Sequence, residues 1–221
     1  MPRKAFRLVW FIWLAVAACS PLRGLPENAG SVGSTDNGYL VGGIQLPSND
    51  DLVVLEPEKA WGTPELVHLL EAVAADMRLA YPDAPPLVVG HLSRREGGSL
   101  SPHRSHQSGR DADVAMYAAD NKLHRRFLDM TSAELDVPKT WALIDTLQTK
   151  GRIQYILLDW EVQQRIYEEI SLFEPEQRLA SLFQYPRPRR TRAGIVRHAS
   201  GHCNHLHVRI HCPEQDTHCI E

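Results

Sequence analysis

The sequence predicts a single α+β domain, in which a small and mostly antiparallel sheet is flanked by helices. Apolar residues recur at helical spacing in the stretches 61–83 and 138–150, with a short β-branched run between them. The segment 111–127 looks like a β-hairpin that turns at Asp120–Asn121, which favours antiparallel pairing. With 221 residues, 43% of them hydrophobic, the chain is long enough to bury one ordinary core.

The first helix is expected within 61–83, where Thr63 is a suitable N-cap and Pro64 suits the first turn. A buried strand over 86–93 follows, and then a long polar loop. The next expected elements are a helix opened by Pro138, a strand over 152–160, and amphipathic helices over 161–170 and 175–183. A loop rich in Pro and Arg precedes the last strand, 205–211.

The N-terminus indicates export. Positive charges at Arg3, Lys4 and Arg7 precede an apolar run over 8–18, which is too short to be a permanent membrane span. The run ends in "VAACS", which resembles the lipobox of bacterial lipoproteins. The resemblance implies a signal peptide over 1–18, lipidation of Cys19, and a periplasmic protein anchored by lipid to the outer membrane. An ordinary signal peptide or an uncleaved anchor is the alternative.

Residues 19–51 are expected to form a flexible tether, and 52–221 to form the folded domain. The stretch 20–50 is rich in Gly, Ser, Asn, Asp and Pro and shows no hydrophobic periodicity. A formal net charge of -3 gives no indication of nucleic-acid binding. Nothing in the sequence indicates a particular protein partner.

The remaining cysteines are interpreted in the light of export, because disulfides form in oxidising compartments. Cys212 and Cys219 are seven residues apart, and turn-forming residues lie between them. A disulfide between them would stabilise the fold by about 2–3 kcal/mol. Cys203 is another candidate partner, but strand-like residues separate it from Cys212, so we expect Cys203 to be free.

Histidines are concentrated on one side of the last expected strand. Side chains alternate along a strand, so His205, His207, Arg209 and His211 point one way while the apolar residues between them point the other. This pattern indicates a strand at the floor of a polar cleft, although a solvated outer face gives the same alternation.

A second cluster lies about a hundred residues upstream. His106 and Asp113 converge on one point only if the chain turns between them, and Gly109 allows that turn. Asp111 is then free to orient an imidazole. Two histidines and one aspartate, with a fourth position for water, are typical of catalytic Zn²⁺.

The stretches "SHQSGRDADV" and "HLHVRIHC" resemble the penicillin-insensitive murein endopeptidases, zinc hydrolases of the bacterial cell wall, and the likeness extends over most of 52–219. It implies that His106, Asp113 and His207 hold zinc and that His205 is the catalytic histidine. It also implies that His202 belongs to the active site and that His103 lies near a second metal. Asp111 or His202 would set the tautomer of His205. The implied substrate is peptidoglycan, cut at its D-alanyl–diaminopimelate cross-links.

Several alternatives stay open at this level. A D-Ala-D-Ala carboxypeptidase or dipeptidase would share the fold and the metal. A peptidoglycan-binding lipoprotein would keep the fold without turnover, and a periplasmic zinc chaperone would need only the histidines. The arginine cluster, Arg187, Arg189, Arg190 and Arg192, suits either anionic peptide stems or a solvated, phospholipid-facing loop.

Overall fold

The computed structural model describes residues 30–221. The proposed signal peptide, Cys19 and the segment 19–29 lie outside the described residues. The elements in chain order are β1 (Ser31–Gly33), β2 (Gly38–Leu40), β3 (Ile44–Gln45), β4 (Leu52–Val54), a 3₁₀ turn (Pro57–Lys59), β5 (Trp61–Gly62), α1 (Pro64–Ala80), β6 (Leu87–Val89), β7 (Asp111–Val114), α2 (Val137–Lys150), β8 (Ile153–Leu158), α3 (Trp160–Ile170), α4 (Glu176–Leu182), β9 (Val196–His198) and β10 (Leu206–Ile210).

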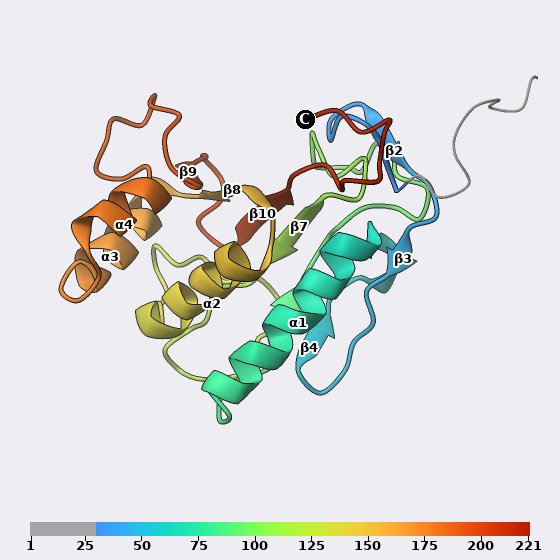
Figure 1. Ribbon diagram of the computed structural model, residues 1–221. Helices are drawn as coiled ribbons and strands as arrows, with labels where there is room; N and C mark the ends of the chain where they lie inside the picture. Colours follow the sequence, from blue (N-terminus) through green and yellow to red (C-terminus); the bar gives the residue numbers. More distant parts are fainter. Residues whose placement is uncertain (1–29) are drawn as a thin grey trace, which may run out of the picture.

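A mixed six-stranded sheet forms the centre of the molecule, with the strand order β4-β6-β7-β10-β8-β9 (Figure 1). The three inner pairings are antiparallel, and the two outer pairings, β4 with β6 and β8 with β9, are parallel. Two small two-stranded sheets, β1–β2 and β3–β5, lie beside it. The predicted α+β class is confirmed.

One face of the sheet is apolar and packs against helices. Ala112, Val114, Leu206, Val208 and Ile156 alternate along β7, β10 and β8, and all belong to the main core cluster. Helices α1 and α2 lie over this face in Figure 1. The intervening residues of the same strands are therefore on the opposite face, which we call the site face.

The helices begin where their capping residues predict. Thr63 accepts a hydrogen bond from Leu66 N at 3.3 Å, and α1 starts at Pro64 as expected. In α2 the cap is Asp136, which accepts from Lys139 N at 2.9 Å, so the helix begins one residue before Pro138. Among residues 30–221, the helices are too short or too polar to cross a membrane.

The tether predicted over 19–51 is wrong for its second part, because residues from Gly30 onward are folded. β1 and β2 pair in antiparallel register, and Leu40 and Leu46 are buried. The Asp216 carboxylate accepts from Gly30 N at 3.0 Å and from Ser31 N at 2.6 Å, which ties this segment to the C-terminal loop. A composition rich in polar residues and glycine did not reveal these long-range contacts.

The hairpin predicted over 111–127 is also wrong. Only β7 forms, and its two edges are already occupied by β6 and β10. A second hairpin strand therefore has no edge to pair with, and residues 115–136 form an irregular loop in which Asn121 has a φ of 54°.

The cysteine predictions are confirmed. Cys212 and Cys219 form a disulfide with their Cα atoms 5.8 Å apart, and Cys203 is free. The chain after the disulfide is held by the buried Arg110, which donates to Ile210 O at 3.2 Å and to Ile220 O at 2.6 Å.

Candidate metal centre

Two strands bring the upstream and downstream clusters together. In the antiparallel register of β7 and β10, His207 lies opposite Asp113 and Arg209 lies opposite Asp111. Directly opposed residues share a face, so all four side chains are on the site face. The pairing explains how residues about a hundred positions apart reach one site.

His106 joins them through a tight turn before β7. Gly109 has a φ of 71°, and a Cβ on it would lie 2.7 Å from a Leu40 methyl carbon, so glycine is required there. His106 itself has a φ of 66°, which is uncommon for a residue with a side chain. Its backbone N donates to Asp111 Oδ2 at 2.9 Å, which holds the turn against β7.

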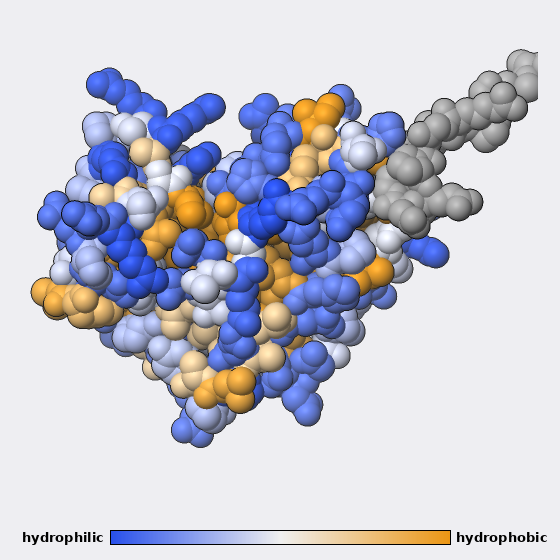
Figure 2. Space-filling model, viewed as in Figure 1, coloured by the Kyte–Doolittle hydropathy of each residue, from blue (hydrophilic) through white to orange (hydrophobic). Residues whose placement is uncertain are grey.

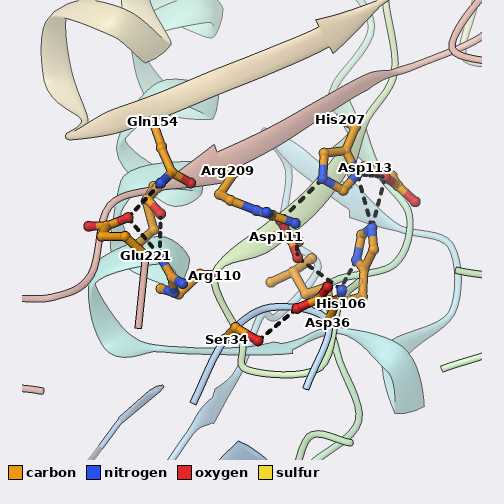
Figure 3. Close-up of polar contacts among 12 residues, drawn as sticks. Ser34, Asp36, His106, Arg110, Asp111, Asp113, Gln154, His207, Arg209 and Glu221 are labelled. Carbon is orange, nitrogen blue, oxygen red and sulfur yellow. Dashed lines mark hydrogen bonds and ion pairs between the residues drawn. The ribbon is translucent and has the colours of Figure 1, made fainter. Parts of the chain in front are cut away.

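Three buried ligand atoms converge in this way. His106 Nε2 lies 3.1 Å from His207 Nδ1, and each lies 3.3 Å from Asp113 Oδ1 (Figure 3). Ligands bound tetrahedrally to zinc at 2.0–2.1 Å are separated by about 3.3–3.4 Å. The three atoms therefore have the spacing of three corners around one ion.

The donor set also fits a metal ion chemically. His106 Nδ1 donates to Leu92 O at 2.7 Å, and His207 Nε2 donates to Asp111 Oδ1 at 3.1 Å, so the opposite ring nitrogens face Asp113. Within residues 30–221, Asp113 Oδ1 is buried and has no hydrogen-bond partner. A buried acceptor without a donor is costly unless a cation satisfies it. Two nitrogens and one oxygen suit zinc.

The charges around the cluster reinforce one another. Asp111 is buried, which alone would raise its pKa, but His207 and Arg209 hold its pKa well below the usual range. Arg209 donates to this carboxylate from Nε at 2.6 Å and from Nη2 at 3.1 Å. Burial lowers the pKa of His207, yet Asp111 and Asp113 together raise it to about 9. His207 is therefore protonated at neutral pH when no metal is bound, and its Nδ1 donates to His106 Nε2.

His205 and His202 lie beside the cluster. His205 Nε2 lies 3.4 Å from Asp113 Oδ1, while its Nδ1 donates to Asn204 Oδ1 at 2.6 Å. The ring stacks on Phe127 at 5.2 Å, and burial lowers its pKa to about 4. The His202 ring is 5.0 Å from His205 and 5.7 Å from His207. His211 lies elsewhere, beside Glu221 at 3.1 Å.

A second group of ligand atoms lies next to the first. His103 Nε2 is 3.6 Å from Asp113 Oδ2 and 2.7 Å from His91 Nδ1, and His91 Nε2 is 2.7 Å from Glu56 Oε1. His91, His103 and Asp113 offer ligand atoms that all lie within 4.8 Å of one another. The sequence analysis missed His91 and Glu56, although an imidazole two residues after the buried apolar strand β6 pointed to His91.

The chain is also similar to known proteins. Residues 31–221 match the family model described as penicillin-insensitive murein endopeptidase. Curated relatives of that name include one from Yersinia enterocolitica, 27% identical over 91% of this chain and 72% of its own length. The relative from Pectobacterium atrosepticum is 26% identical over 95% of this chain and 72% of its own length. The relative from Escherichia coli is 24% identical over 88% of this chain and 71% of its own length. The chain therefore belongs to the penicillin-insensitive murein endopeptidase family.

Proposed function

We propose that this protein is a zinc-dependent peptidoglycan endopeptidase that hydrolyses D-alanyl–diaminopimelate cross-links in the murein sacculus. One observation carries the proposal: the convergence of His106 Nε2, His207 Nδ1 and the unpartnered Asp113 Oδ1. The names of the relatives support the substrate class.

His106, Asp113 and His207 are the proposed zinc ligands. When bound, zinc polarises an amide carbonyl and lowers the pKa of coordinated water to about 7. Leu92 O and Asp111 fix the orientation of the two imidazoles through their outer nitrogens. Asp111 is thus a positioning residue, which acts through His207.

His205 is the proposed proton carrier. Its Nδ1–H is held by Asn204, and burial keeps the ring neutral at neutral pH, so Nε2 has a lone pair directed at the cluster. Nε2 accepts a proton from the attacking water and delivers it to the leaving amine. His202 is proposed to belong to the same active site, because its ring centroid is 5.0 Å from that of His205.

The second group is proposed to bind metal more weakly than the first. His91 and His103 are only partly buried, whereas all three residues of the first group are buried, so water competes more strongly for an ion at the second group. We expect one tight zinc per chain, and a second ion only at higher concentration.

We also propose that the mature protein is a periplasmic lipoprotein. The support is the run 8–18 and the lipobox-like "VAACS" ending. Cys19 would carry the lipid that attaches the protein to the outer membrane, a short tether would span 19–29, and the folded domain would begin at residue 30.

Digestion of purified sacculi with the zinc-loaded protein tests the activity. Release of monomeric muropeptides from cross-linked dimers is expected. Release of free D-Ala instead would indicate a carboxypeptidase, and unchanged muropeptides would indicate a binding protein. A His205→Ala preparation serves as the matched control, because it should bind zinc but cut at least about a hundredfold more slowly.

A further inference from the structure

A cavity of about 520 Å³ lies over the sheet edge formed by β8 and β9. Four arginines contribute to its lining, and among the described residues no carboxylate does; the lining comprises Tyr155, Leu157, Gln184, Arg189, Arg190, Thr191, Arg192, Arg197 and His198. In Figure 2, strongly hydrophilic side chains gather at the upper left, over the loop that precedes β9. The cavity is therefore positively charged.

The cavity is on the same face of the sheet as the metal centre. His207 on β10 lies opposite Leu157 on β8, and Leu157 lies opposite Arg197 on β9. Neighbouring strands are about 4.8 Å apart, so the backbones of His207 and Arg197 are about 10 Å apart. An extended peptide covers that distance in about three residues.

Tyr155 connects the two sites. The centroid of its ring is 6.4 Å from that of the His207 ring. The Arg209 guanidinium, which donates to Asp111, lies 4.8 Å from the Tyr155 ring centroid. Arg197 lies over the same ring at 5.4 Å on the cavity side. A peptide that leaves the metal centre across Tyr155 reaches Arg197 directly.

The loop is held by contacts that do not use the guanidinium groups of Arg190 and Arg192. Gln184 donates to Arg189 O at 2.7 Å, and Arg187 ties the loop to Phe183 O at 3.0 Å. By contrast, Arg190 and Arg192 form no ion pair with any residue in 30–221 and are exposed. Unpaired guanidinium groups in a concave site suit bidentate recognition of a carboxylate.

We propose that this cavity binds a free carboxylate of the peptidoglycan stem peptide, two or three residues from the bond that is cut. The assignment of the ligand to the stem peptide rests on the proposed function. A phospholipid headgroup has the same negative charge, but the cavity is concave and continues the metal site along one sheet face, which favours a peptide.

Fluorescence anisotropy tests the proposal by measuring how tightly a rhodamine-labelled stem tetrapeptide binds to the zinc-loaded full chain. The peptide is compared with the same peptide in which the carboxylates are primary amides. We expect amidation to weaken binding about tenfold, and Arg190→Gln or Arg192→Gln to weaken binding of the free acid by a similar factor. Lys122→Gln is the matched control, because Lys122 is exposed in a loop whose Asn121 contacts Asp83 O, away from the cavity.

Equal binding of acid and amide, or equal losses in Arg192→Gln and Lys122→Gln, would overturn the proposal. So would a loss of binding to anionic phospholipid vesicles in Arg192→Gln with unchanged peptide affinity. Digestion of sacculi distinguishes failure of the carboxylate site from failure of the proposed endopeptidase activity. Carboxylate-dependent binding without any cleavage keeps the cavity and rejects the endopeptidase, and cleavage without carboxylate dependence does the reverse.

Discussion

Asp111 offers the sharpest single test of how the metal centre is held together. Its buried carboxylate accepts from Arg209 Nε at 2.6 Å, from His106 N at 2.9 Å and from His207 Nε2 at 3.1 Å. Asp111→Asn keeps the shape of the side chain but replaces one acceptor oxygen by an NH₂ group. At least one of these donors then faces another donor and loses its partner.

The expected losses of zinc affinity and of stability in Asp111→Asn follow from these contacts. Loss of the carboxylate behind a ligating histidine lowers metal affinity by about 10–100-fold. This corresponds to about 1.4–2.7 kcal/mol of binding free energy. The unpartnered buried donor should in addition lower the free energy of unfolding by about 1–3 kcal/mol.

Competition against a chromophoric zinc chelator measures the zinc affinity. Denaturant unfolding of the metal-free protein measures the free energy of unfolding. Asp36→Asn is the matched control, since Asp36 lies near the cluster in Figure 3 but accepts from Ser34 Oγ at 2.7 Å. If Asp111→Asn binds zinc as tightly as the control does, the orienting role of Asp111 is refuted.

Three further predictions address the remaining roles. His207→Ala should lose zinc and activity together, whereas His205→Ala should keep stoichiometric zinc and lose about 10²–10⁴-fold in turnover; equal metal loss in both would reject this division. Because the folded-state pKa of His207 is raised to about 9, the proton on His207 stabilises the metal-free protein fully below about pH 6.5, and this stability is lost as pH rises through 9. Zinc displaces that proton, so apparent zinc affinity should rise about tenfold per pH unit and level off above pH 9, and a flat profile would contradict it. Labelled palmitate should enter the wild-type protein but not Cys19→Ser, and label in both would exclude lipidation at Cys19.

The convergence of His106, Asp113 and His207 was predictable because local rules govern its parts. Strand alternation places His205 and His207 on one side of the chain, and the spacing of His106 and Asp113 demands the turn that Gly109 makes. The structure differs in two details. β10 begins at Leu206, so His205 directly precedes it, and His211 lies beyond the strand, beside Glu221. The tautomers were not predictable, because they depend on Leu92 O and Asp111 Oδ1 in the folded protein.

The errors concern contacts that only the whole fold determines. The start of the segment 30–51 is held by Asp216, far along the chain, which accepts hydrogen bonds from Gly30 N and Ser31 N. The predicted hairpin fails because β10, from the other end of the sequence, occupies the edge of β7. His91 likewise meets His103 and Glu56 only in the tertiary structure. Alternation and composition carry no information about such partners.

X-ray absorption at the zinc edge of the purified, zinc-loaded protein tests the central claim most directly. We expect a four-coordinate ion with two imidazole nitrogens and with oxygen ligands, all at about 2.0–2.2 Å, and the loss of one imidazole in His207→Ala. A sulfur ligand at about 2.3 Å, or an imidazole count unchanged in His207→Ala, would contradict the assignment of His106, Asp113 and His207 as the zinc ligands.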